Sequence, residues 1–233
     1  MKAWVDFIVG QCSEPYLWNT GWHYGDWLFY SVDNDTSGVS AVTYKPLIQQ
    51  CFFANSADVT AKAAAVLGLE KEAAYYADVA AKAREAFCNA YLTPAGYLVS
   101  ATQTAYVLAL NFDMLPEPMR PVVAARLADK VREYGHITTG FLGTPYICHV
   151  LSEWGYTDLA YMLLLRQQYP GWLYPVTMGA TTIWERWNSM MPDRTIPNNG
   201  MNSFNHYSYG AIGDWLYRDA VGLHETSAGF KTM

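Results

Sequence analysis

The chain has 233 residues, enough for one large domain or two small ones. Hydrophobic residues make up 52% of it and charged residues only 15%, a ratio that favours a compact core over disorder. A net charge of −6 without any basic run argues against nucleic acids and anionic membrane surfaces as partners. No apolar stretch approaches the length of a membrane span, and the first residues do not resemble a signal peptide. Localisation stays open.

Apolar residues recur at helical spacing along most of the chain, which predicts about eight helices. They are expected at residues 4–9, 39–67, 70–92, 102–115, 120–134, 144–154, 157–169 and 203–221. Gly68 and Gly135 follow two of them as stop signals. Only residues 97–99 and 173–176 are candidates for extended structure. Successive helical hairpins predict an all-α fold, either an α/α toroid or a helical repeat array, and the lack of a strict period argues against a regular solenoid.

Two segments without helical pattern, residues 13–40 and 170–202, are rich in reactive side chains, and long loops on a helical scaffold often carry function. In the first, Trp27 beside Asp26 is typical of a sugar-stacking platform with a hydroxyl acceptor. Thr36 and Ser37 are predicted to cap the helix that begins near residue 39. Gly-Asp-Trp-Leu occurs at 25–28 and again at 213–216, by chance or at equivalent positions of a pseudo-symmetric barrel.

The second segment places a carboxylate, Glu185, between Trp184 and Trp187, with Arg186 next to it. Burial beside tryptophan disfavours the charged form of a carboxyl group, while a neighbouring arginine favours it. Such opposed influences suit a general base, which must be ionised and still take a proton from water. A structural ion pair between Glu185 and Arg186 explains the same residues equally well.

His206 falls early in the last predicted helix and is expected to point toward the same cavity as Glu185. There it would hydrogen-bond a sugar hydroxyl or orient a carboxylate, although a lone histidine near a helix start is more often structural. The segment 136–146 joins two helices and is expected at the cavity rim. Thr144 as a cap followed by Pro145 also explains its end without any function.

Cofactor and metal signals are absent from the sequence. The four cysteines form no C-x-x-C pair, so free core thiols are expected rather than a zinc or redox site. No nucleophile elbow, P-loop or dinucleotide-binding fingerprint occurs. Aromatic residues make up 15% of the chain, which fits either sugar stacking or a large aromatic core.

Several motifs in order, GATTIWERW, HITTGFLGTPY, ATQTAYVLAL, LAYMLLLRQQYPGWLY and SFNHYSYGAIGDWLY, resemble the α-L-rhamnosidases of glycoside hydrolase family 78. The resemblance covers nearly the whole chain. It implies an (α/α)6 barrel that hydrolyses terminal α-L-rhamnosides with inversion, with a rhamnose-containing glycoside as substrate and no cofactor or metal. It further implies that Glu185 is the general base, that His206 and Trp27 contact the sugar, and that Asp26 and Trp184 belong to the substrate site.

The chain departs from the family pattern at the general acid. The family's acid is a glutamate in a segment resembling D-x-x-x-R-x-E-R-x-G-W, and nothing in this sequence matches it; Glu14, the only early glutamate, has a different context. Inversion needs two carboxylates roughly 6.5–9.5 Å apart. We therefore expect a fragment, an incomplete barrel whose first helices are missing and whose partner is the remaining N-terminal part of the same enzyme. Residues 1–223 would be barrel, and 224–233 would start a linker to a missing β-sandwich.

Two alternatives remain at this point. One is a non-catalytic or degenerate carbohydrate-binding domain, and the other is a related helical-barrel hydrolase with a different sugar specificity. The TTIWERW motif and His206 argue against the second alternative.

Overall fold

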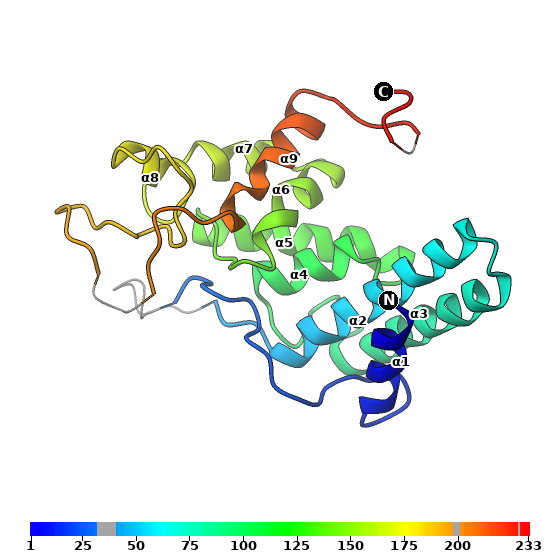
Figure 1. Cartoon of the computed structure of the whole chain (residues 1–233). Helices are drawn as coiled ribbons and strands as arrows, with labels where there is room; N and C mark the ends of the chain where they lie inside the picture. Colours follow the sequence, from blue (N-terminus) through cyan, green and yellow to red (C-terminus); the bar gives the residue numbers. More distant parts are fainter. Residues whose placement is uncertain (32–40, 198–200, 228) are drawn as a thin grey trace.

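The computed structural model describes residues 1–31, 41–197, 201–227 and 229–233, and this part of the chain is helical, with isolated bridges in place of strands (Figure 1). Its α-helices are α1 (Lys2–Gln11), α2 (Lys45–Val66), α3 (Glu70–Tyr91), α4 (Gln103–Asn111), α5 (Arg120–Tyr134), α6 (Thr144–Glu153), α7 (Thr157–Leu165), α8 (Leu173–Thr177) and α9 (Ile212–Trp215). Turns of 3-10 helix, Glu117–Met119 and Ser208–Ala211, precede α5 and α9, and a π-helical turn, Leu216–Ala220, continues α9.

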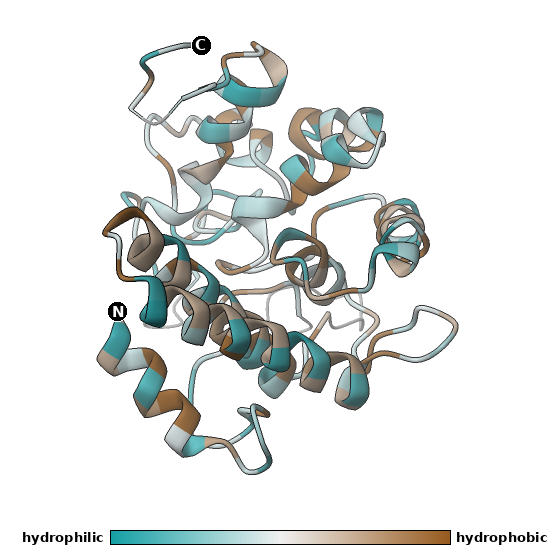
Figure 2. Ribbon diagram, turned by 90° about the vertical axis from the view of Figure 1, so that its right-hand side faces the viewer, coloured by the Kyte–Doolittle hydropathy of each residue, from teal (hydrophilic) through white to brown (hydrophobic). Residues whose placement is uncertain are grey.

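The helices form two layers. Helices α2, α4, α6 and α9 pack against one another in that order as an inner row, and α3, α5 and α7 pair with the first three of them as hairpins. Every residue from Gln103 to Leu110 of α4 is buried, whereas α3 buries only one face, which includes Val79, Ala83 and Phe87. Figure 2 shows polar and apolar bands alternating along the helices, as expected where one face meets the core.

The joints between helices differ in length at the two ends of the fold. Three residues, 67–69, join α2 to α3, and three more, 154–156, join α6 to α7. The segments that precede the inner helices α2, α6 and α9 are long and contain both loops predicted to carry function. Since the helices of each hairpin run in opposite directions, the inner helices all begin at the same end. The long segments therefore gather there, on the left of Figure 1.

Buried glutamines fasten these segments to the inner helices. Gln50 of α2 accepts a hydrogen bond from the backbone of Trp18 and donates to the carbonyls of Tyr16 and Ala83. Gln103 of α4 accepts from the amide of Thr138 and donates to the carbonyl of His136. A buried side-chain amide must find hydrogen-bond partners. These contacts therefore hold the backbone of residues 16–18 against α2 and that of residues 136–138 against α4.

The last inner helix is attached to α6 by polar contacts. Both ring nitrogens of His149 face carboxylates, Nδ1 at 2.7 Å from Asp219 and Nε2 at 3.1 Å from Asp214. The indole of Trp215 donates to the hydroxyl of Ser152. Of the two explanations left open for the repeated Gly-Asp-Trp-Leu segment, the structure favours chance, because Asp214 lies in this helix whereas Asp26 lies in a loop.

Most predicted helices are present, with several local differences. The helix predicted from residue 39 begins at Lys45, and those predicted to end at residues 115 and 169 end at Asn111 and Leu165. Residues 173–176, predicted as extended, form the short helix α8. The last predicted helix begins with the 3-10 turn at Ser208 rather than at residue 203, so His206 precedes it. Thr144 does not cap α6 with its side chain, which instead hydrogen-bonds Thr139 inside the preceding loop. The predicted caps Thr36 and Ser37 lie outside the described residues.

All four cysteines are free thiols, as predicted. Burial raises the pKa of Cys148 to about 12 and raises that of Cys51 far above its usual range. Because the thiolate is the reactive form, both thiols should stay unlabelled by a chromogenic disulfide reagent at pH 8 in the folded chain and react fully in denaturant. Peptide mapping after labelling measures this, and rapid native labelling of Cys51 would contradict the burial described here.

None of the helices in the described ranges is long and apolar enough to span a bilayer.

Candidate active site

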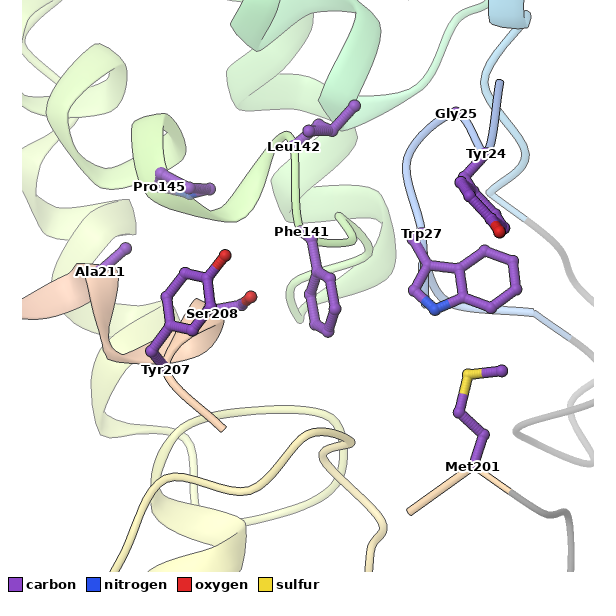
Figure 3. Close-up of a pocket in the computed structure, with 10 residues that line it drawn as sticks. All are labelled: Tyr24, Gly25, Trp27, Phe141, Leu142, Pro145, Met201, Tyr207, Ser208 and Ala211. Atoms are coloured by element: carbon purple, nitrogen blue, oxygen red, sulfur yellow. The ribbon is translucent and has the colours of Figure 1, made fainter. Parts of the chain in front are cut away.

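A cavity of about 640 Å³ opens where the long segments meet at the start of the inner helices. Three parts of the chain form its walls: the loop before α2, the loop that leads into α6, and the residues around the turn before α9 (Figure 3). The lining residues are Tyr24, Gly25, Trp27, Phe141, Leu142, Pro145, Met201, Tyr207, Ser208 and Ala211. The predicted rim segment 136–146 thus contributes Phe141, Leu142 and Pro145.

The walls of this cavity are aromatic, with hydroxyl groups at their edges. Tyr24 and Trp27 lie on one side, edge to face at 5.2 Å, and Tyr207 and Ser208 lie on the other side with Phe141 between them (Figure 3). Sugars present apolar ring faces with polar rims, and a cavity of aromatic faces with a few hydroxyls is complementary to such a ligand.

Asp26 is buried behind this wall, with 4% of its surface exposed. Its carboxylate accepts hydrogen bonds from the hydroxyl of Thr104 and from the backbone amides of Gly140, Leu142 and Gly143. Burial raises the pKa of Asp26, and these four donors act in the opposite direction. The structure therefore places Asp26 beside Trp27 but turned toward the protein.

The loops that carry Trp27 and Phe141 are joined along their backbones. The amide of Phe141 donates to the carbonyl of Trp27 at 2.9 Å, and the amide of Tyr30 donates to the carbonyl of Thr138 at 3.0 Å. Gly140 lies between these two contacts, where its backbone approaches that of residues 26–29 closely. Backbone hydrogen bonds therefore join the wall that contains Trp27 directly to the wall that contains Phe141.

The segments of Glu185 and His206 lie side by side. The amide of Glu185 donates to the carbonyl of Ser203 at 2.9 Å, and the amide of His206 donates to the carbonyl of Ile183 at 2.8 Å. The His206 ring stacks on Phe141, with 5.0 Å between ring centroids, so the histidine lies directly against a wall of the cavity. Its Nδ1 accepts from the amide of Ser208, which leaves the proton of the neutral ring on Nε2.

Glu185 is half-buried, and within the described part of the chain its carboxylate makes no ion pair, with Arg186 or any other residue. Burial first, and then the charge of Asp26, raise the pKa of the Tyr209 phenol, and the charge of Glu185 adds to the rise while Arg186 opposes it. Tyr209 in turn meets Phe141 edge to face at 5.2 Å.

Trp184 belongs to a second, smaller cavity of about 280 Å³, which Trp172, Trp187 and Tyr209 also line. Its ring is 5% exposed and packs edge to face on Phe204. The predicted residues therefore divide among neighbouring positions, with Trp27 in the first cavity, His206 against the wall of that cavity, and Trp184 in the second one. No group of three or more potential metal ligands occurs among the described residues.

Tyr209 is a residue that sequence reasoning missed. Its ring stacks on Trp187 at 3.8 Å, its hydroxyl donates to the carbonyl of Leu28, and its own carbonyl accepts from the indole of Trp172. It therefore ties the loop of Trp27 to the segment of Glu185. Its place in a predicted helix gave no signal of this, because the contacts are made to residues far away in the sequence.

Residues 1–220 match the family model of the bacterial alpha-L-rhamnosidase 6 hairpin glycosidase domain. The chain belongs to this family. It is 42% identical over 211 residues to an alpha-L-rhamnosidase of Streptomyces avermitilis and 43% identical over 243 residues to one of Formosa agariphila. These matches cover 90% and 100% of this chain but only 19% and 25% of the relatives, so the chain spans about a fifth to a quarter of their length.

Solved structures give the same assignment to this glycosidase family. The alpha-L-rhamnosidase of S. avermitilis, solved in complex with L-rhamnose, superposes with a TM-score of 0.89 at 40% identity, over 98% of this chain and 21% of that one. The enzyme from Aspergillus terreus superposes with a TM-score of 0.91 at 35% identity, over 98% and 26%. The two helical layers are therefore part of an α/α barrel, which confirms the predicted fold class.

Proposed function

We propose that this chain is the part of an inverting α-L-rhamnosidase that binds the terminal rhamnose and supplies the general base. Glu185 takes a proton from the attacking water, His206 donates a hydrogen bond from Nε2 to a sugar hydroxyl, and Trp27 stacks on the sugar ring. Trp184, buried against Phe204, holds the neighbouring Glu185 in place. The relatives of the chain are alpha-L-rhamnosidases by name, which supports the sugar and the reaction.

The observation that carries this proposal is the pairing of the Glu185 and His206 segments beside an aromatic cavity. A half-buried carboxylate without an ion-pair partner can hold a water molecule and accept its proton, whereas one paired with Arg186 would be a poorer base. The pairing keeps that carboxylate within the same part of the fold as the histidine and the stacking platform.

A second carboxylate, the general acid, is needed to protonate the leaving oxygen. No segment of this sequence has the pattern expected for it. We therefore expect the 233-residue chain by itself to bind rhamnose without appreciable hydrolysis.

Binding of free L-rhamnose tests the proposed site directly. Titration followed by NMR should shift the indole signal of Trp27, and Trp27→Ala should weaken binding by about tenfold because the stacking face is lost. Trp154→Ala, at the opposite end of α6, is the matched control and should bind like the parent chain. Unchanged affinity in Trp27→Ala would place the sugar elsewhere.

The same titration separates the sugar specificities. D-Glucose and D-glucuronate should bind more weakly than L-rhamnose if the cavity belongs to a rhamnosidase. Tighter binding of D-glucuronate would favour a related barrel hydrolase with another substrate.

A further inference from the structure

The carboxylate of Asp26 has its hydrogen-bonding capacity filled by the protein. Oδ1 accepts from the amides of Leu142 at 2.8 Å and Gly143 at 3.2 Å, while Oδ2 accepts from the hydroxyl of Thr104 at 2.5 Å and the amide of Gly140 at 2.8 Å. A carboxylate offers about four acceptor positions. With 4% of its surface exposed, Asp26 has no oxygen directed to the cavity for a sugar hydroxyl.

The donors come from the loop that leads into α6 and from the first turn of α4. Gly140, Leu142 and Gly143 precede α6, which has no capping side chain of its own at Gly143, and Thr104 lies in the first turn of α4. Gly143 is the N-cap of α6, so its amide belongs to the helix start, where amides lack partners within the helix and a carboxylate is stabilising. Asp26 supplies that carboxylate from a loop more than 100 residues away.

The residues held in this way are the neighbours of the cavity walls. Trp27 follows Asp26 directly, and Phe141 lies between two of the amides that Asp26 accepts from. The amide of Phe141 itself donates to the carbonyl of Trp27. Asp26 therefore holds the residues on both sides of Phe141 next to the loop of Trp27, and His206 packs on the Phe141 ring.

We propose that Asp26 is a positioning residue that sets the separation of the Trp27 and Phe141 walls, and that it does not contact the sugar. The consequence for rhamnose affinity rests on the function proposed above, whereas the effect on the two walls does not.

Asp26→Asn tests this with almost no change of shape. The amide group of asparagine places a donor against backbone donors, so at least one of the four hydrogen bonds is lost. Thr104→Val removes one donor only, and Thr104→Ser keeps it and should restore the parent behaviour. In the 233-residue chain we expect Asp26→Asn to speed hydrogen exchange at the Phe141 amide by about tenfold and to shift the Trp27 indole signal.

L-Rhamnose affinity should fall by about tenfold in Asp26→Asn and less in Thr104→Val. Phe87→Leu is the control for general loss of stability, because Phe87 is fully buried on the outer helix α3. This variant should lower the melting temperature while leaving Phe141 exchange, the Trp27 signal and rhamnose affinity unchanged.

The outcomes separate the two proposals. If the parent chain does not bind L-rhamnose, the proposed function fails, and the NMR signals of Trp27 and Phe141 still decide the role of Asp26. If Asp26→Asn loses sugar affinity while both signals stay unchanged, Asp26 contacts the sugar and the positioning role is overturned. If Asp26→Asn does not fold, the Thr104→Val and Thr104→Ser pair decides, and unaltered signals in Thr104→Val would overturn the proposal.

Discussion

Replacing Glu185 with glutamine is expected to lower kcat for an aryl α-L-rhamnoside by about 100-fold to 10,000-fold, the usual contribution of a general base. The reaction also requires a general acid, and no segment of this sequence matches the pattern expected for one. The measurement therefore uses a chimera in which this chain replaces the corresponding part of the S. avermitilis relative. KM should change little, since glutamine keeps the size of the side chain and removes an interaction needed in the transition state.

Glu153→Gln in the same chimera is the matched control, because Glu153 is exposed at the far end of α6. It should retain the activity of the parent chimera. The product of the parent, observed by NMR during the first turnovers, should be the β-anomer of L-rhamnose if the mechanism inverts. Glu185→Gln retaining half of the parent kcat would remove Glu185 from the role of base.

The helices of this chain were largely predictable because their signals are local. Apolar spacing defined residues 120–134, and the helix ends there at Gly135, whose φ of 68° suits glycine. The same reasoning located α3 to within one residue of its end. In both cases the sequence contains the apolar stripe that faces the core and a residue that stops the helix. Tertiary contacts therefore changed the bounds of these helices very little.

Prediction failed where contacts between distant segments override local preference. Residues 203–207 have helical spacing, but their backbone pairs with residues 183–185 and so cannot form a helix. Residues 173–176 contain aromatic and β-branched side chains typical of strands, yet no neighbouring strand exists for them in the described part of the fold, and they form a helical turn.

Only part of the cavity lining could be predicted from the sequence, and Glu185 and His206 are not among the residues that line either of the two cavities described above. Trp27 and the segment of Phe141 were expected at the cavity, and both line it. The orientation of Asp26 was not predictable, since its amide donors lie at least 114 residues further along the chain. An aspartate beside a tryptophan has the same appearance in the sequence whether it faces a sugar or a helix end.

Gly140 is the residue whose substitution should damage the fold most. A Cβ atom there would lie 2.2 Å from the carbonyl oxygen of Trp27 and 2.8 Å from both the carbonyl oxygen of Asp26 and the amide nitrogen of Phe29. All three are backbone atoms of a loop fixed on both sides by hydrogen bonds, so no flexible side chain can move away. We expect Gly140→Ala to lower the free energy of unfolding by about 3 kcal/mol or more, measured by urea denaturation.

Gly10→Ala provides the comparison, because Gly10 lies in α1 with open space around the position of its Cβ. Alanine is the better helix former, so this variant should be as stable as the parent or more stable by about 0.5–1 kcal/mol. The contrast isolates the close approach of the two loops from the general effect of replacing glycine. Equal urea midpoints for Gly140→Ala and Gly10→Ala would mean that the loops of Trp27 and Phe141 are not joined as described, and the common wall of the cavity would have to be abandoned.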